Sequence, residues 1–318
     1  MVNIVIPVYN SRETLPLALD SLVAQTKKMF IVTLSIDGDN EDYSDIVEEY
    51  ERRGLHIRVI RGKNGGPGPA RQRGVDCDKM CDYVMFMDAD DCLMPNAIDT
   101  LYSEAKRNRV DVLASDFICE QKNKSNLLMD VMDSPITWCH GKIYSTKYLR
   151  DNDIRFRDDL RYNEDSYFNL VAVNCAERKS KLQEVTYLWR YNEKSITRQG
   201  SYMDFFRLYW EMYVYSQVKG IEKIISLRGE INLNLLAATL INIYKWTMTA
   251  ISCKYDISKA EEYIKELGNE PKVLEALDEL GFWAYIHENL KASYYIDDKL
   301  IFFSERFSDW VKRLIKGE

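Results

Sequence analysis

The first part of the chain alternates short apolar runs with segments in which apolar residues recur at helical spacing. Between the first two runs, Leu15, Leu19 and Leu22 share one face of a helix that Ser11 would cap. The β-branched and aromatic runs themselves predict strands at 2–8, 30–36, 55–60, 83–87 and 110–114. Apolar strands that alternate with helices are typical of a doubly wound, mostly parallel α/β sheet covered on both faces.

The pattern changes near residue 201. Strand patterns stop there, and helical periodicity continues almost to residue 318. We therefore expect an α/β domain over residues 1–200 and a separate helical domain over 201–318. The longest apolar stretch, 231–251, is interrupted by Asn234, Asn242 and Lys245, which favours a buried helix over a membrane span.

Composition narrows the class of protein. Hydrophobic residues make up 46% of the 318 positions, which is enough for a sizeable core. The formal net charge of −7 argues against nucleic-acid binding, because phosphate backbones repel an acidic surface. Seven cysteines, an odd number, and the lack of a secretory leader before the first strand predict reduced thiols and a cytoplasmic protein.

Polar residues gather where the predicted strands end. Pro7 and Tyr9 follow the first strand, Asp37 the second, the Gly/Pro-rich segment 64–69 the third, and the acidic segment 88–91 the fourth. Ligands of an open parallel sheet bind outside the carboxyl ends of the strands. These segments therefore predict one site along one edge of the sheet.

The acidic segment is a candidate metal site. Asp-x-Asp triplets recur elsewhere in the chain, so the triplet alone carries little information. Asp88 and Asp90 differ from the others because they directly follow the apolar run YVMFM, which would hold them on a rigid strand. Hard oxygen ligands of this kind suit Mg²⁺ or Mn²⁺ shared with phosphates. A solvated acidic turn is the alternative.

Two further segments carry candidate chemistry. Arg71 follows the glycines into a helix, an arrangement that suits a diphosphate, although a simple turn also explains the glycines. Glu164 and Asp165 open a segment with helical spacing. Asp165 is either a general base facing the site or an acid that compensates the helix dipole.

Aromatic residues near the same segments allow two interpretations. Trp138 and Trp189 would stack on a sugar or belong to the core. His140 would line an acceptor or metal site, or be a structural histidine. Cys77 and Cys81 lack a second ligand pair, which argues against zinc.

Taken together, these motifs resemble those of the family 2 glycosyltransferases of the GT-A fold, over roughly residues 1–200. The family's donor-binding start is similar to VNIVIPVYNSRETLPLALDSLVAQT, and its Asn-x-Gly-x-x-x-Ala-Arg-Asn-x-Gly element to NGGPGPARQRG, with Gln72 in place of Asn. Its metal-binding strand end is similar to FMDADDCLMP, and its Lys-Leu-Tyr and Glu-Asp segments to GKIYS and RYNEDSYF. The order and spacing of these pieces make the match specific.

The resemblance implies a fold, an activity and a set of roles. The chain would be an inverting, metal-dependent transferase that moves a sugar from a nucleotide sugar, by default a UDP-sugar, to a carbohydrate or lipid-linked acceptor. Asp165 would be the catalytic base, and Asp90 would bind Mn²⁺ or Mg²⁺. The donor would contact Pro7, Tyr9, Asp37, Asn64, Arg71 and Asp88, and the acceptor Glu164, His140 and Trp138.

A departure from the family pattern after the second strand affects the donor site. The family usually has two adjacent aspartates after the second strand, whereas here Ile36 precedes Asp37. One contact with the base or ribose would then be missing, or Asp39 would replace it.

The helical domain lies outside the resemblance. It would shape the acceptor site or form oligomer contacts. Phe307, Trp310 and Leu314 in the last helix share one stripe, which would touch the inner face of the membrane peripherally. A core-facing helix is the alternative.

Other functions remain open on the sequence. A nucleotidyltransferase would place a Gly-rich loop after the first strand, where this chain has Pro-Val-Tyr-Asn. A non-catalytic nucleotide-sugar or glycan binding protein on the same scaffold is a second alternative. A transferase acting on modified phage DNA is a third, although the acidic charge argues against tight DNA binding.

Overall fold

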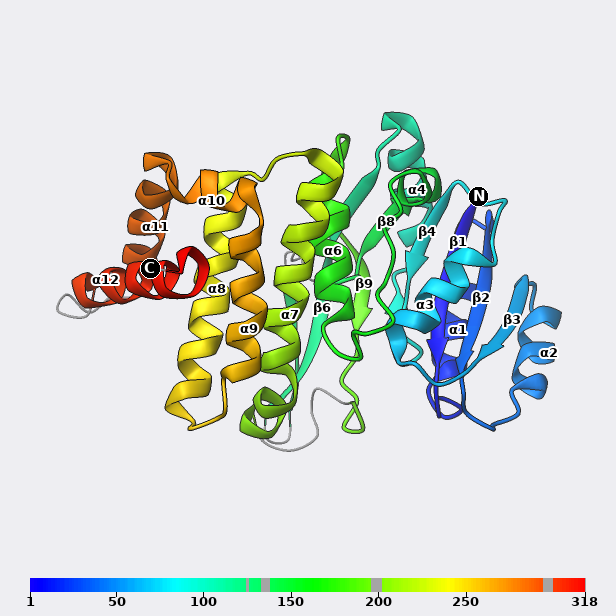
Figure 1. Cartoon of the computed structure of the whole chain (residues 1–318). Coiled ribbons are helices and arrows are strands. Elements are labelled where there is room, and N and C mark those ends of the chain that lie inside the picture. Colours follow the sequence, from blue (N-terminus) through cyan, green and yellow to red (C-terminus); the bar gives the residue numbers. More distant parts are fainter. Residues whose placement is uncertain (124–125, 133–137, 196–201, 294–299, 318) are drawn as a thin grey trace. The chain divides into compact units, whose positions relative to one another are not determined.

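The computed structural model describes residues 1–123, 126–132, 138–195, 202–293 and 300–317. The chain divides into two compact units, Met1–Arg198 and Gln199–Glu318 (Figure 1). Each unit has its own secondary-structure class: the first is α/β, and the described residues of the second are helical.

The amino-terminal half of the first unit is a parallel sheet in the order β3-β2-β1-β4. This arrangement confirms the doubly wound fold, because consecutive strands are joined by helices. The strands are β1 (Val2–Val8), β2 (Phe30–Asp37), β3 (Ile57–Gly62) and β4 (Tyr83–Phe86). The connecting helices are α1 (Leu15–Val23), α2 (Ser44–Arg52) and α3 (Pro67–Asp76).

The sheet continues beyond β4 with mixed strand directions. β8 (Lys142–Ser145) pairs antiparallel with both β4 and β6 (Val112–Asn123). β6 pairs in parallel with β9 (Lys179–Trp189), which also carries the short β5 (Cys92–Leu93). The helices of this part are α4 (Ala97–Asn108), α5 (Thr146–Asp151) and α6 (Glu164–Cys175).

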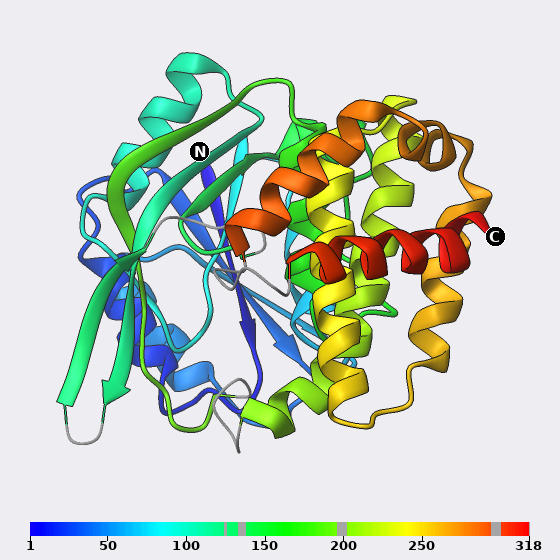
Figure 2. The same ribbon diagram turned by 90° about the vertical axis from the view of Figure 1, so that its left-hand side faces the viewer.

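The sequence predicts only the start of β6. The strand runs on to Asn123 and forms a hairpin with β7 (Asn126–Met132), which Figure 2 shows as a two-stranded ribbon. The polar stretch from Cys119 to Asn123 lacks the apolar run that marked the other strands. Pairing with β7 and β9, rather than local pattern, makes it a strand.

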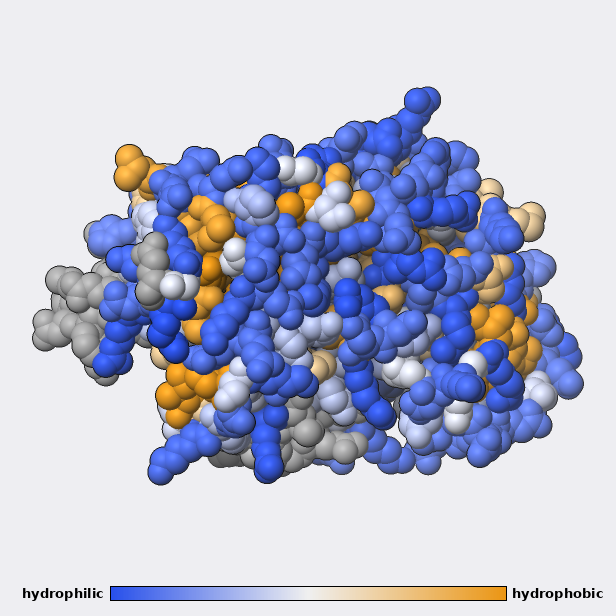
Figure 3. All heavy atoms as spheres, viewed as in Figure 1, coloured by the Kyte–Doolittle hydropathy of each residue, from blue (hydrophilic) through white to orange (hydrophobic). Residues whose placement is uncertain are grey.

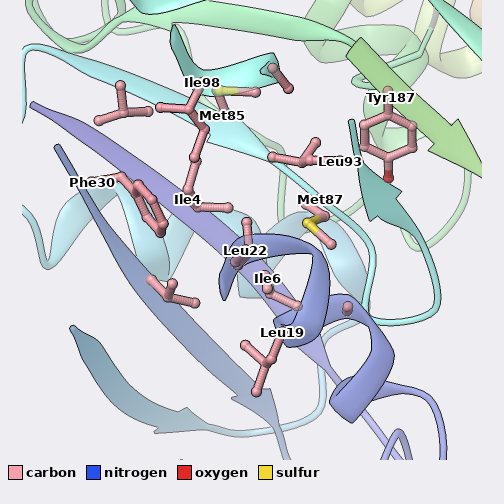
Figure 4. Packing of buried hydrophobic residues seen from close by; sticks show 14 of the residues in the cluster. Ile4, Ile6, Leu19, Leu22, Phe30, Met85, Met87, Leu93, Ile98 and Tyr187 are labelled. Carbon is pink, nitrogen blue, oxygen red and sulfur yellow. The ribbon is translucent and has the colours of Figure 1, made fainter. Parts of the chain in front are cut away.

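The core of the first unit lies between β1 and the helices that cover it. Ile4 and Ile6 of β1 meet Leu19 and Leu22 of α1, as Figure 4 shows. On the opposite face of β1, Val5 packs against Gly74 of α3, and Asn3 donates a hydrogen bond to the Gly74 carbonyl (3.0 Å). α3 therefore lies close against β1, which fixes the direction in which its arginines point.

The second unit consists of helices. They are α7 (Tyr202–Arg228), α8 (Leu233–Ser252), α9 (Ser258–Glu266), α10 (Pro271–Leu277), α11 (Leu280–Ser293) and α12 (Leu300–Val311). No helix in the described part of the chain is both long and apolar enough to cross a membrane. The face shown in Figure 3 is mostly hydrophilic, with hydrophobic side chains in separate patches.

The apolar stripe of the last helix faces the interior of its own unit. Phe307 and Trp310 are buried, and both rings contact Tyr244 of α8 at centroid distances of 5.3 Å. Val311 and Leu314 are buried as well. Burial of these side chains favours the core-facing interpretation of the stripe.

The close approach of α3 to β1 predicts the effect of a substitution. A Cβ at Gly74 would lie 2.3 Å from Cγ1 of Val5, so Gly74→Ala forces the helix away from the sheet. We expect a loss of about 1–3 kcal/mol in the free energy of unfolding, measured by urea denaturation. Gly281→Ala is the control, because its Cβ would lie 3.6 Å from Leu233, an ordinary contact. Equal stability of the two variants would contradict this packing.

Candidate active site

The Gly-rich loop before α3 is held by the carboxylate at the end of β2. Asp37 is buried, and its Oδ2 accepts hydrogen bonds from the backbone N–H groups of Gly66 (2.7 Å) and Gly65 (3.2 Å). Its Oδ1 pairs with Nη2 of Arg73 at 2.7 Å. These bonds organise the loop that carries Asn64, and the contact of Asp37 with the nucleoside stays a prediction.

Asp39 plays a similar structural part beside it. Its Oδ2 accepts hydrogen bonds from the Asn10 N–H (2.8 Å) and the Tyr43 hydroxyl (2.9 Å), and so joins the ends of β1 and β2. Next to it an open groove of about 450 Å³ lies at the carboxyl ends of β2 and β3. Its lining consists of Ile36, Gly38, Asp39, Asn40, Glu41, Asp42, Arg61 and Gly62. Tyr9 is 52% exposed, Asn64 is exposed, and Pro7 is half-buried.

A buried arginine joins three elements at the centre of the sheet edge. Nη1 of Arg71 donates to Oε1 of Glu164 at 2.8 Å, and Nη2 donates to Oδ1 of Asp88 at 2.7 Å. The Arg71 and Glu164 side chains are only 7% and 8% exposed, while Asp88 is 33% exposed. This Arg71 triad (Arg71, Asp88 and Glu164) brings together α3, the end of β4 and the start of α6.

The triad sets the charge around the predicted base. Burial, together with the neighbouring charge of Glu164, raises the pKa of Asp165 to about 7. Burial also raises the pKa of Glu164 against the opposing effect of Arg71. For Asp88 burial acts in the same direction, but Arg71 and His140 outweigh it and lower the pKa. The guanidinium therefore lies between Asp88, whose pKa is lowered, and Glu164, whose pKa is raised, and Asp165 directly follows Glu164.

A hydrogen-bond network fastens the acidic turn to β9. Oη of Tyr187 accepts from the Asp88 N–H (3.2 Å) and donates to Oδ2 of Asp91 (2.6 Å). Oδ1 of Asp91 accepts from the Arg190 N–H (2.9 Å), and Oδ2 of Asp90 accepts from the Asn192 amide (2.8 Å). Tyr187 and Asn192 were not predicted from the sequence, because only the pairing of β9 with β6 and β5 brings them to this turn.

His140 lies among aromatic rings beside the same turn. Its ring stacks on Trp189 (centroids 5.6 Å apart, planes at 26°) and also contacts Tyr187 and Trp138. Burial lowers the pKa of His140 to about 4, so the imidazole is neutral at pH 7. The structure brings His140 next to Asp88 and Asp91, with Trp138 against the His140 ring. Their contact with an acceptor stays a prediction.

The side chains of the turn fit a hard divalent cation. Within the described residues, one ligand atom from each of Asp88, Asp91 and His140 lies within 4.8 Å of the others. Carboxylate oxygens with a neutral imidazole nitrogen suit Mn²⁺, and carboxylates alone suit Mg²⁺. Asp90, which the sequence assigned to the metal, is outside that group but belongs to the same turn.

Comparison with known proteins identifies the family. The model of the family described as glycosyl transferase family 2 matches residues 3–168, more than half of the chain. The chain belongs to this family. Its first unit has the GT-A fold, as the sequence resemblance predicts.

Two relatives show how far the similarity extends along the chain. The glycosyltransferase EpsJ of Bacillus subtilis, described as uncharacterized, is 28% identical over 217 residues, which are 62% of this chain and 63% of EpsJ. TarS of Staphylococcus aureus, a poly(ribitol-phosphate) β-N-acetylglucosaminyltransferase, is 27% identical over 214 residues, 63% of this chain and 36% of TarS. The matched region therefore spans less than two thirds of either relative.

Solved structures share the fold. The crystal structure of TarS 1–349 in complex with UDP has a TM-score of 0.68 at 21% identity, covering 96% of this chain and 87% of that chain. A mannosyltransferase from Pyrobaculum calidifontis in complex with GDP-Man and Mn²⁺ has a TM-score of 0.53 at 12% identity, covering 100% and 88%. At these identities the likeness shows the fold alone.

The network around Tyr187 predicts the effect of removing one hydroxyl. Tyr187→Phe leaves the buried Asp91 short of a donor, which should cost about 1–3 kcal/mol in the free energy of unfolding. It also releases the backbone of Asp88, so we expect Mn²⁺ affinity, measured by calorimetry, to fall about tenfold. Tyr50→Phe is the control: the hydroxyl of this buried tyrosine lies within donor distance of two acceptors, the Pro16 carbonyl (2.6 Å) and Oδ1 of Asp20 (2.9 Å), and its loss should change stability only. Unchanged Mn²⁺ affinity in Tyr187→Phe would remove Tyr187 from the site.

Proposed function

We propose that this protein is an inverting, metal-dependent glycosyltransferase. It moves a sugar from a UDP-sugar to a hydroxyl group of a carbohydrate or lipid-linked acceptor. The observation that carries the proposal is the Arg71 triad, because it holds the Asp88 end of β4 and the Asp165 end of α6 on one guanidinium. A base and a donor-binding carboxylate at a defined separation are what a single displacement requires.

Asp165 takes the proton of the acceptor hydroxyl in this proposal. A general base works best when its pKa lies near the working pH, and burial and Glu164 raise the pKa of Asp165 to about 7. Attack by the deprotonating hydroxyl on the anomeric carbon expels the nucleoside diphosphate from the opposite face. One displacement of this kind inverts the anomeric configuration.

The donor occupies the carboxyl edge of the parallel strands. In this proposal the nucleoside lies by the groove at the ends of β2 and β3. Pro7, Tyr9, Asp37 and Asn64, at or just after the ends of β1, β2 and β3, contact it. Arg71 and Asp88 lie toward the ribose and diphosphate. TarS, which has the same fold, was crystallised with UDP and with UDP-GlcNAc, and this supports UDP as the nucleotide.

Asp90 would hold Mn²⁺ or Mg²⁺ together with Asp88, Asp91 and His140, whose ligand atoms lie within 4.8 Å of one another. Such an ion, when bound, neutralises negative charge on the leaving diphosphate. The chain's own contribution is to orient these ligands: Tyr187 and the Arg190 N–H hold Asp91, and Asn192 holds Asp90.

The acceptor side is formed by aromatic surface. Sugars stack on aromatic rings, and the partly buried Trp138 and Trp189 contact each other and His140. The name of the relative TarS refers to poly(ribitol phosphate), which supports a cell-surface polysaccharide as acceptor. We further propose that residues 201–318 shape the acceptor site or form oligomer contacts.

The seven cysteines are free thiols, which supports a cytoplasmic location.

Asp165→Asn tests the proposal. The amide cannot take the proton, so we expect the transfer rate to fall about a thousandfold while the calorimetric affinity for UDP changes less than about twofold. Transfer is followed by UDP release with a polysaccharide acceptor panel. Asp158→Asn, an exposed acid on the loop before α6, should leave both quantities unchanged.

The pH dependence follows from the same residue. A base acts only when deprotonated, so kcat of the parent protein should be level above pH 7 and fall about tenfold per pH unit below it. A turnover rate that Asp165→Asn leaves intact would remove Asp165 from the mechanism.

A further inference from the structure

Glu164 is an acid that the proposed mechanism does not require for contact with substrate. It is the first residue of α6 and directly precedes Asp165. Its carboxylate is buried and accepts a hydrogen bond from Arg71 at 2.8 Å. Burying an ionised acid is costly unless the acid is paired. The ion pair with Arg71 therefore stabilises the ionised form of Glu164 in its buried position.

That contact joins the start of α6 to α3. The side chain of the N-cap residue Asn163 does not cap the helix, and its backbone is left-handed (φ 59°). Within the first turn, the Ser166 N–H donates instead to Oδ1 of Asp165 at 2.8 Å. The ion pair from Glu164 to α3 supplies an attachment of another kind.

The Glu164 side chain also packs closely against α3. A Cβ at Gly68 of α3 would lie 2.8 Å from Cγ of Glu164, so only glycine lets the two helices approach this far. Gly68 and Arg71 are three residues apart in α3 and therefore face the same way. Glu164 thus lies against one face of α3, between a glycine and the guanidinium.

We propose, on the basis of the function above, that Glu164 is a positioning residue for the transfer reaction. Its ion pair with Arg71 ties the first turn of α6, and with it Asp165, to the Asp88 end of β4. The carboxylate acts through Arg71 and has no contact with the reacting atoms. This role differs from the acceptor contact that the sequence suggests for Glu164.

Glu164 is also one of the charged groups that act on the pKa of Asp165. Negative groups facing Asp165 are Glu164 and Asp88, and positive groups are Arg71 and the buried Lys142 of β8. Cys139 and Tyr144 face it as well, and burial raises the pKa of both, so they are neutral. Removing the charge of Glu164 alone should therefore make Asp165 easier to deprotonate.

Two substitutions at Glu164 distinguish its effect on the position of Asp165 from its effect on the pKa of Asp165. Glu164→Gln keeps an oxygen that accepts from Arg71 but loses the charge. We expect kcat at the optimal pH to stay within about fivefold, while the acid limb of the pH profile moves down by about one pH unit. Glu164→Ala loses the attachment, and we expect kcat to fall about a hundredfold with the KM for the donor changed less than about threefold.

The ionisation of Asp165 is also followed without turnover. Carboxyl NMR of the protein labelled with [¹³Cγ]Asp, with the Asp165 signal assigned from Asp165→Asn, reports the midpoint directly. Asp111→Asn is the matched control, because Asp111 is another buried acid paired with an arginine, Arg178, at 2.8 Å. It should lower the melting temperature and leave the Asp165 midpoint in place.

An unchanged Asp165 midpoint in Glu164→Gln, or full kcat in Glu164→Ala, overturns the positioning role. A purely structural residue would behave like Asp111 and shift only the melting temperature. If the parent protein transfers no sugar at all, the proposed function fails. In that case the NMR titration of Asp165 in Glu164→Gln still shows whether Glu164 affects the pKa of Asp165.

Discussion

The burial of one guanidinium between two carboxylates constrains the whole site. A charge removed from water is stable only when its partners are in place, so α3, β4 and α6 must converge on Arg71. That convergence explains the small residues around it. Gly74 lets α3 lie on β1, and Gly68 lets Glu164 reach the arginine. The positions of Asp88 and Asp165 follow from this contact.

Around this centre, acidic residues serve two purposes. The carboxylates of Asp37 and Asp39 accept hydrogen bonds from backbone N–H groups and from Tyr43, and Asp37 pairs with Arg73. These contacts position the loops that a donor would touch. Asp88, Asp90 and Asp91 lie on a turn whose backbone is tied to β9 through Tyr187. Asp37 and Asp39 thus position the loops at the strand ends, and the turn holds the residues that fit a cation.

The parallel strands and the edge at which they gather polar residues could be predicted from sequence, because both depend on local apolar runs and on a general rule for parallel sheets. Arg71, Asp88 and Glu164 were recognisable as unusual residues, but their contact was not. It joins positions 17 and 93 residues apart along the chain. Tyr187, Asn192 and the β6–β7 hairpin could not be predicted, since each depends on strand pairing that leaves no local pattern.

The central claim is that the acidic turn binds a nucleotide sugar together with a divalent cation. The most direct measurement is the melting temperature of the protein with a panel of nucleotide sugars, each with and without Mn²⁺, for the parent chain and for Asp90→Ala. A ligand that binds only the folded state raises the melting temperature. The account predicts a rise with one UDP-sugar that requires Mn²⁺ and is lost in Asp90→Ala. The same rise without Mn²⁺, or in Asp90→Ala, would contradict it.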